Sequence, residues 1–213
     1  MVQKLCGFFL NIDLQINNMK VTRGSGLLEV FLAKKRAKLA NSLITKSHRS
    51  GRILDVGCGS YPYFLTTTKF KEKYGIDPSV NLSLVEDAGI IFKKIKIDKK
   101  TLPFENNYFD VVTMLAVFEH INQNELIPVI KEIKRVLKKD GVLIITTPAP
   151  WSDRLLHKMA LIGLISSEEI HEHKHNHSKH KIENILESAG FEKEKIKSGF
   201  FELYMNMWFT AKK

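Results

Sequence analysis

The stretch Ile53-Leu-Asp-Val-Gly-Cys-Gly-Ser60 decides the fold, because a short apolar run ends directly in a glycine turn. A run of this length is typical of a buried strand, and the turn after it is typical of a connection to a helix. Gly57 and Gly59 let the backbone turn tightly and approach a ligand that a Cβ atom would exclude. The same turn also suits a plain strand–helix connection, so the glycines alone do not define a site.

Strand-like and helix-like segments alternate on both sides of this turn. The pattern predicts strands at Arg52–Val56, Tyr74–Ile76, Lys93–Ile97, Phe109–Leu115 and Val142–Thr147. It predicts helices at Leu27–Ile44, Tyr63–Phe70, Glu125–Leu137, Ser152–Ile165 and Lys179–Ala189, the last capped by Ser178 and ended by Gly190. Two further β-like runs between Phe191 and Thr210 have no helix between them and are expected to pair antiparallel.

This order of elements predicts a single Rossmann-like, doubly wound α/β sheet, mostly parallel with an antiparallel C-terminal strand pair. Residues 1–48 are expected to form an N-terminal helical cap, and residues 49–213 to form the α/β domain. In open sheets of this kind, ligands bind beyond the carboxyl ends of the strands, where the strand order reverses. The candidate site is therefore expected at that edge.

The composition is that of an ordinary globular protein. The chain has 213 residues, of which 44% are hydrophobic and 26% charged, enough for one sizeable core. Its two cysteines, Cys6 and Cys58, exclude a disulfide framework and favour a reducing compartment. No run approaches the ~18 apolar residues of a membrane span, and the apolar run after Met1 is shorter than a signal sequence needs. A cytoplasmic protein is expected.

The chain carries a formal charge of +10, from 33 Lys and Arg residues against 23 Asp and Glu residues. Such a charge attracts nucleic acid, anionic membrane surfaces or acidic small molecules, and it does not say which. Lysine-rich basicity is often only a solvated surface. Nucleic acid is therefore the less favoured partner, and the oligomeric state stays open.

Two acidic residues follow the next two predicted strands. Asp77 lies twenty residues after Gly57 and can accept hydrogen bonds from both hydroxyls of a ribose, although Asp77-Pro78 also suits a plain turn. Asp98 can accept a hydrogen bond from an adenine amino group, or it is a solvated acid beside lysines. A dinucleotide fingerprint needs a third glycine at position 62, which is Pro62. The pattern therefore favours one adenosine over a dinucleotide.

With these motifs the chain resembles the class I S-adenosylmethionine-dependent methyltransferases, in the group of type-11 methyltransferase domains. The resemblance runs from about Leu27 to the end and rests on several motifs in order. They are ILDVGCGS (Ile53 to Ser60), YGIDPS (Tyr74 to Ser79), Asp98 with Leu102-Pro-Phe104, ENNYFDVV (Glu105 to Val112), VFEHI (Val117 to Ile121), EIKRVLKKDGVLIITTP (Glu132 to Pro148) and SKHKIENILESAGF (Ser178 to Phe191). It implies S-adenosyl-L-methionine as the cofactor and S-adenosyl-L-homocysteine as its product.

The resemblance also implies roles for single residues around the cofactor. Asp55, Gly57, Cys58 and Gly59 would line the methionine part and the sulfonium, with Leu115 at its border. Asp77 would hold the ribose, and Pro78, Asp98 and the main chain of Lys99 would surround the adenine. The family usually has another glycine at position 61, where this chain has Tyr61. A phenol there is expected to close over the cofactor or to begin the acceptor pocket.

On the acceptor side, the resemblance points to residues after the fourth and fifth predicted strands. His120 is a candidate general base or acceptor contact, or a histidine that only packs at a helix start. Trp151 begins a predicted acceptor-side lid, 151–177, in which His173 would line the acceptor pocket. Leu115-Ala-Val-Phe118 stands where adenine and amide N-methyltransferases often carry an Asn/Asp-Pro-Pro-aromatic motif. A DNA-adenine or protein-glutamine acceptor is therefore disfavoured.

Two features of the predicted lid allow alternative interpretations. The apolar helix within 152–165 either packs on the core or contacts a membrane or a lipid-linked acceptor, aided by the basic charge. His171, His173, His175 and His177 would share one face of an extended segment and could bind zinc, but no cysteine or carboxylate set joins them. No functional metal is expected.

Methyl transfer from a sulfonium is an in-line displacement, so the protein mainly has to hold donor and acceptor near attack geometry in a dry site. The sequence predicts a methyltransferase that acts on a small or lipid- or glycan-linked acceptor, at oxygen or carbon. An RNA methyltransferase, favoured by charge, and a non-catalytic, partner-binding domain of the same fold are the alternatives. The intact Asp55, Gly57, Gly59 and Asp77 argue against the second.

Overall fold

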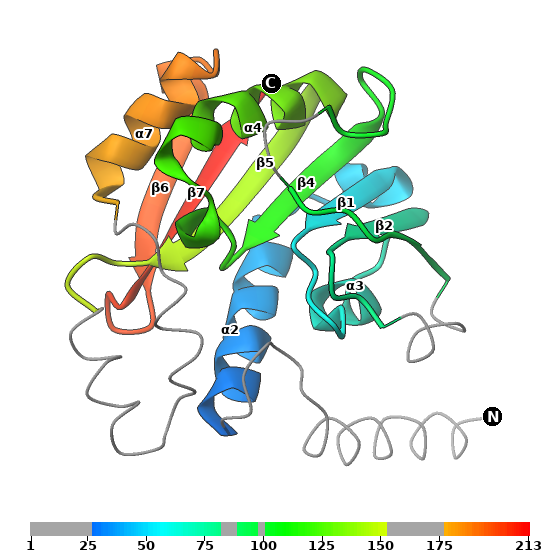
Figure 1. Cartoon of the computed structure of the whole chain (residues 1–213), viewed down its shortest axis with the longest axis horizontal. Coiled ribbons are helices and arrows are strands. Elements are labelled where there is room, and N and C mark those ends of the chain that lie inside the picture. Colours follow the sequence, from blue (N-terminus) through cyan, green and yellow to red (C-terminus); the bar gives the residue numbers. More distant parts are fainter. Residues whose placement is uncertain (1–26, 82–88, 98–100, 153–176) are drawn as a thin grey trace.

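The computed structural model describes residues 27–81, 89–97, 101–152 and 177–213. Its centre is a seven-stranded sheet with the strand order β3-β2-β1-β4-β5-β7-β6 (Figure 1). The strands are β1 (Arg52–Val56), β2 (Glu72–Ile76), β3 (Ile90–Lys93), β4 (Phe109–Leu115), β5 (Leu137–Pro148), β6 (Ile196–Phe201) and β7 (Asn206–Lys212). Strands β1 to β5 pair in parallel, and β7 is antiparallel to both β5 and β6. The predicted fold class is confirmed.

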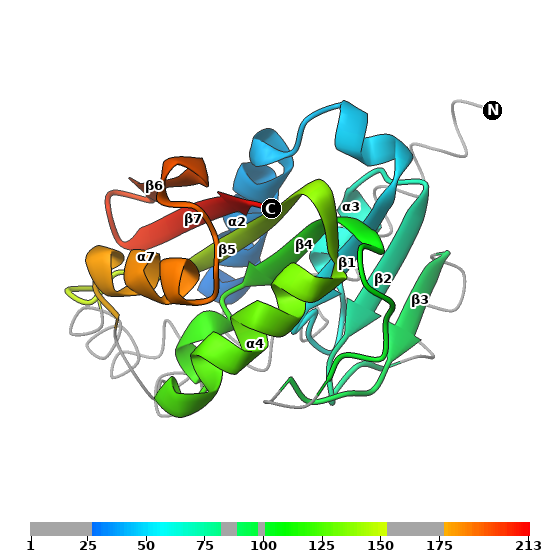
Figure 2. The ribbon, with the colours of Figure 1, turned by 90° about the horizontal axis from the view of Figure 1, so that it is seen from above.

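Helices cover both faces of the sheet (Figure 2). Helices α2 (Leu27–Leu43) and α3 (Tyr63–Thr67) lie on one face, and α4 (Gln123–Val136) and α7 (Lys179–Ser188) lie on the other. Three short 3-10 helices complete the described elements: η1 (Ser47–Ser50), η4 (Phe118–His120) and η5 (Lys193–Lys195). The predicted cap of α7 is confirmed, because the Ser178 hydroxyl accepts a hydrogen bond from the backbone N–H of Lys181 at 3.3 Å.

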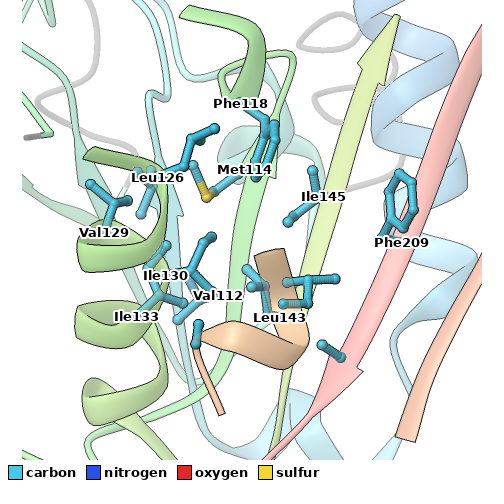
Figure 3. Packing of buried hydrophobic residues seen from close by; sticks show 14 of the residues in the cluster. Val112, Met114, Phe118, Leu126, Val129, Ile130, Ile133, Leu143, Ile145 and Phe209 are labelled. Carbon is cyan, nitrogen blue, oxygen red and sulfur yellow. The ribbon is translucent and has the colours of Figure 1, made fainter. Parts of the chain in front are cut away.

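Alternate residues of the central strands supply two cores. Leu54 and Val56 of β1 join the core under α4 and α7, whereas Ile53 joins the core under α2 and α3. Figure 3 shows the first core, where Val129 and Ile133 of α4 belong to one apolar stripe of the helix. Because both faces are covered, these parallel strands read as nearly continuous apolar runs. This explains why the sequence located β1 and β4 so well.

The third strand lies earlier in the chain than predicted. It runs from Ile90 to Lys93 instead of Lys93–Ile97, and its last pairing is Ile76 with Lys93. Because β2 ends at Ile76, the residues after Lys93 have no partner strand on which to continue the ladder. The alternation of lysine and isoleucine after Lys93 imitates a strand, but the pairing with β2 fixes where the strand lies.

The start of β5 and the end of α3 also differ clearly from the predictions. Strand β5 begins at Leu137 rather than Val142, and its pairing with β4 shifts register between Phe109 and Val111. Gly141 therefore lies inside an irregular stretch of β5 and not in a turn before it. Helix α3 ends at Thr67 rather than Phe70, because Thr68 is extended, with ψ 156°.

The described residues include only parts of the predicted cap and lid. Within the cap, 1–48, they show α2, whose Ala37 and Ala40 are buried in the core. Most of the lid, 151–177, including the helix predicted within 152–165, lies outside the described residues. No helix in the described part of the chain is long and apolar enough to span a membrane.

Candidate functional site

The candidate site lies at the carboxyl ends of β1, β2 and β4. The strand order reverses between β1 and β4, since β2 and β3 lie on one side of this point and β5 lies on the other. A crevice forms at such a switch point in open α/β sheets. Asp55, Asp77 and Leu115 all lie at or just after these strand ends, as the sequence predicts.

The glycine turn after β1 is bound to the end of β2. The backbone N–H groups of Gly57 and Cys58 both donate to the carbonyl oxygen of Ile76, at 2.8 and 3.3 Å. Gly57 and Gly59 have φ angles of 73° and 76°, which glycine adopts without strain. A Cβ atom on Gly57 would also stand 2.4 Å from Cγ2 of Val117. Position 57 therefore requires glycine for two independent reasons.

Asp77 is a buried carboxylate that holds this turn from the side of β2. Its Oδ2 accepts a hydrogen bond from the N–H of Gly59 at 3.0 Å. Its Oδ1 accepts one from the N–H of Ser79 at 2.7 Å and another from the Ser79 hydroxyl. An ionised carboxylate offers about four acceptor positions, and the hydroxyl of a serine can rotate to a new partner. Asp77 can therefore hold the turn and still accept from a ligand hydroxyl.

A second buried carboxylate, Asp55, lies near Asp77. Thr113 of β4 is its direct neighbour in the parallel ladder and donates its hydroxyl to Oδ1 of Asp55 at 2.6 Å. Burial raises the pKa of Asp55 to about 7, against the opposing hydrogen bond from Thr113 and with a smaller contribution from the charge of Asp77. Asp55 therefore changes its charge close to neutral pH.

Cys58 lies between these two acids and packs into the core under α3. Burial raises the pKa of its thiol, and the charges of Asp55 and Asp77 raise it further. A thiol in such surroundings stays protonated, and the protonated form is neither a nucleophile nor a metal ligand. Cys58 is therefore a neutral, buried thiol next to the glycine turn.

The chain leaves β4 through a left-handed residue. Ala116 has a φ of 57°, and its N–H donates to the carbonyl oxygen of Thr146 on β5 at 2.9 Å. The following 3-10 helix buries Phe118 and leaves His120 half-buried. His120 thus lies beyond the carboxyl end of β4, at the position the sequence predicts.

Glu119 is a candidate residue that the sequence analysis missed. Its side chain is 2% exposed, and within the described part of the chain its Oε2 has no hydrogen-bond partner. A buried polar atom without a partner is destabilising, and a carboxylate of this kind near a crevice is a candidate ligand contact. The signal in the sequence is an acid directly before His120, in a stretch that is otherwise apolar.

The other predicted site residues are partly or largely exposed, or they lie outside the described residues. Tyr61 is half-buried, and Pro78 and Trp151 are exposed. Asp98, Lys99 and His173 lie outside the described residues, so their roles stay predictions.

Of the four alternating histidines, the described residues include His177. It is buried, and its ring stands edge-on to that of Phe118, with 5.6 Å between ring centroids. Within residues 27–81, 89–97, 101–152 and 177–213, no three His, Cys, Asp or Glu side chains gather as a metal ion would require.

Comparison with protein families identifies the domain. Residues 28–196 match the family model described as a methyltransferase domain. The chain belongs to this methyltransferase family. The matched range contains the glycine turn, Asp77 and His120, so the resemblance to class I methyltransferases is confirmed. S-adenosylmethionine is the cofactor of such a domain.

Two curated relatives of this chain come from Methanocaldococcus jannaschii, and both are described as uncharacterized proteins. One is 34% identical over 93 residues, which are 44% of this chain and 39% of the relative. The other is 25% identical over 161 residues, which are 75% of this chain and 60% of the relative. The match therefore spans less than two thirds of either relative.

Solved structures share the fold at low sequence identity. A methyltransferase from Thermotoga maritima aligns with a TM-score of 0.64 at 19% identity, over 84% of this chain and 87% of that one. A methyltransferase from Archaeoglobus fulgidus aligns with a TM-score of 0.63 at 18% identity, over 85% of this chain and 94% of that one. A methyltransferase from Mesorhizobium loti aligns with a TM-score of 0.62 at 18% identity, over 85% of this chain and 100% of that one. At these identities the likeness establishes the fold alone.

The described residues fit S-adenosylmethionine. The cofactor carries two positive groups, the sulfonium and the amine, and a ribose with two hydroxyls. The carboxylates of Asp55 and Asp77 supply negative charge and hydrogen-bond acceptors beside the neutral thiol of Cys58. Gly57 and Gly59 leave the backbone between these acids without side chains. Two carboxylates beside a turn that contains two glycines suit a cationic nucleoside.

Proposed function

We propose that the methyltransferase transfers the methyl group of S-adenosylmethionine by in-line displacement to oxygen or carbon of a small or lipid- or glycan-linked acceptor. The observation that carries this proposal is the glycine turn held by buried Asp77 next to buried Asp55 at the switch point of the sheet. This arrangement supports the binding of one cationic adenosine cofactor.

Bound S-adenosylmethionine supplies a methyl carbon already activated by the sulfonium. Asp77 orients the ribose through its carboxylate, and ionised Asp55 offsets the positive charge of the ligand. Cys58 keeps its proton, so its sulfur does not compete with the acceptor for the methyl group. The main contribution of the protein is then to hold both reactants in line and to exclude water.

A hydroxyl acceptor must lose its proton as the new O–C bond forms, which requires a base. We assign this role to His120, because it lies beyond β4 and is half-buried. Glu119, buried directly before it, is the proposed acceptor-orienting carboxylate. His120→Ala is then expected to lower kcat about 100-fold and to leave the affinity for S-adenosylhomocysteine unchanged. His180→Ala, at an exposed histidine of α7, is the matched control.

The residues that follow β4 disfavour the nitrogen of an adenine or of a side-chain amide as the acceptor. Leu115-Ala-Val-Phe118 offers no side-chain amide or carboxylate to hold an amino group in the plane of a base. Phe118 itself is buried in the core rather than exposed for stacking. These observations support an acceptor other than adenine.

The test is transfer of a labelled methyl group into a fractionated cell extract, with Asp77→Ala as the inactive control. Label in the lipid, glycan or small-molecule fraction with the wild-type protein alone would support the proposal. Label in RNA, together with RNA binding that falls steeply with salt, would replace it with RNA methylation. Absence of label from every fraction, despite calorimetric binding of S-adenosylhomocysteine, would favour a non-catalytic domain.

A further inference from the structure

The large exposed apolar side chains of the methyltransferase gather at one corner. Among the described residues, six large hydrophobic side chains are exposed, and only Ile91 on β3 lies at the far end of the sheet. The other five form what we call the apolar corner: Phe31 (51% exposed), Trp151 (52%), Phe200 (41%), Leu203 (87%) and Tyr204 (68%). They come from α2, from the turn after β5 and from the β6–β7 hairpin, whose tip projects beyond the sheet in Figure 1.

Contacts join the hairpin tip to the turn after β5. The rings of Phe200 and Tyr204 lie 5.5 Å apart at the β6–β7 turn. The N–H of Ala149, just after β5, donates to the carbonyl oxygen of Met205 at 2.8 Å. This bond brings the turn that carries Trp151 against the hairpin tip.

The hairpin tip presents its side chains from a strained backbone. Glu202, Leu203 and Tyr204 have φ angles of 53°, 53° and 65°, the left-handed region that side chains disfavour. The tip is nevertheless held, because the N–H of Met205 donates to the Glu202 carbonyl at 3.0 Å and the Asn206 amide donates to the Glu202 carboxylate at 2.6 Å. Strain of this kind is concentrated in segments that bind ligands or partners.

Basic side chains of α2 border the apolar corner. Nζ of Lys35 lies 5.1 Å from the ring centroid of Phe31. Burial raises the pKa of Glu202, while the nearby charges of Arg36 and Lys35 lower it, so both cations lie close to the hairpin tip. Glu202, the acid of this corner, is itself half-buried and engaged by Asn206. The exposed charge at the border is therefore positive.

We propose that the apolar corner docks on an anionic membrane surface, with Leu203, Tyr204 and Trp151 entering the interface and Lys35 and Arg36 contacting lipid phosphates. Aromatic and leucine side chains next to cations are the combination that holds proteins at lipid headgroups. The chain as a whole, with a formal charge of +10, is attracted to such a surface. A second copy of this chain would be repelled by the same charge.

The apolar corner faces the same edge as the cofactor site. Pro148 at the end of β5 pairs with Asn206 at the start of β7, so the β6–β7 turn lies at the carboxyl edge of the parallel strands. β1 and β7 are separated by three strand spacings, about 14 Å at the usual distance between strands. A membrane held at the corner would bring a lipid-linked acceptor to the methyl donor; for that acceptor the inference rests on the proposed function.

The test is flotation of the full chain with vesicles of phosphatidylcholine alone or mixed with phosphatidylglycerol, at low and high salt. The wild-type protein is expected to float with the mixed vesicles and to be partly released by salt. The double substitution Leu203→Ser with Tyr204→Ser is expected to reduce the floated fraction about tenfold. Ile91→Ser, which removes an equally apolar exposed side chain far from the corner, is the control and should float like the wild type. Lys35→Glu with Arg36→Glu should abolish the preference for the mixed vesicles.

Binding of S-adenosylhomocysteine by each variant verifies that it is folded. A wild-type protein that stays at the bottom of the gradient with mixed vesicles at low salt would overturn the proposal. A Leu203/Tyr204 variant that floats as well as the wild type would also overturn it. A change of that variant from dimer to monomer, with no vesicle binding by the wild type, would assign the corner to self-association instead. Label in the lipid fraction without vesicle binding would sink the docking surface and keep the proposed function. Vesicle binding without label in lipid would keep the docking surface and exclude a lipid-linked acceptor.

Discussion

The two ends of the sheet's carboxyl edge are built in opposite ways. At the β1–β2 end, Gly57 and Gly59 adopt left-handed φ angles without strain, and the carboxylate of Asp77 is buried among its donors. At the β6–β7 end, residues with side chains adopt the same φ region, and Leu203 is 87% exposed. At the first end the polar groups already have partners within the chain, whereas at the second end apolar side chains of the described residues are exposed.

This difference separates a segment that carries a recognisable motif from a segment that carries none. The cofactor end consists of residues that a recognisable motif contains. The β6–β7 end consists of Glu202-Leu-Tyr204, a sequence that no turn rule would select. We therefore expect substitutions at the first end to act on stability and cofactor affinity, and substitutions at the second to leave both unchanged.

The largest effect is expected from Gly57→Ala. The new Cβ would meet Val117 at 2.4 Å and would also hold a side chain at a φ of 73°. Gly89→Ala is the matched control, because Gly89 has a φ of 59° but no atom within 4 Å of a built Cβ. Urea unfolding should show a loss of about 3 kcal/mol for the first and about 1 kcal/mol for the second. Equal losses would show that the contact with Val117 is unimportant.

Asp77→Ala is expected to weaken the binding of S-adenosylhomocysteine about 100-fold in calorimetry, because the carboxylate both holds Gly59 and accepts from the ribose. Asp110→Ala is the control at the opposite end of β4, where Asp110 accepts hydrogen bonds from the N–H of Arg52 and from Lys138. It should lower stability and leave the affinity unchanged. If the two variants lost affinity equally, the role of Asp77 at the cofactor would be wrong.

Asp55 is expected to make cofactor affinity depend on pH. Its pKa is raised to about 7, so a cationic ligand binds best above that pH, when the carboxylate is ionised. Affinity for S-adenosylmethionine should rise by up to about tenfold per pH unit below 7 and level off above it. Asp55→Asn should flatten this profile in calorimetry.

Stability of the free protein should follow the opposite trend. Between the ordinary pKa of 3.8 and about 7, folded Asp55 keeps a proton that the unfolded chain has lost. Stability therefore falls as the pH rises through this range. A free protein whose stability rose there, beyond any rise in Asp55→Asn, would contradict the burial of Asp55.

A smaller effect is expected from Thr113→Val, which removes the hydroxyl donor to Asp55. Because that bond favours the ionised form, its loss raises the pKa of Asp55 further. The midpoint of the affinity profile should move upward by about one pH unit or less. A downward movement would contradict the assigned hydrogen bond.

Much of the fold could be predicted from the sequence, and the reasons are local. β1 and β4 were bounded correctly because each is an apolar run that a turn ends. β3 was placed late because the strand is fixed by pairing with Ile76 of β2, which a sequence does not display. At the site, the glycine turn and Asp77 were predicted, but Glu119 was not. An acidic residue next to a histidine is expected to be solvated, and only the structure shows that Glu119 is buried.

The two tryptophans of the chain lie in very different surroundings. Trp208 of β7 covers Gly199 of β6, where a built Cβ would stand 2.7 Å from its Nε1, whereas Trp151 is 52% exposed at the apolar corner. In a Trp208→Phe protein, all tryptophan fluorescence would come from Trp151 at the apolar corner. Its emission would move to shorter wavelength on leaving water, so the docking step could be timed without an attached dye.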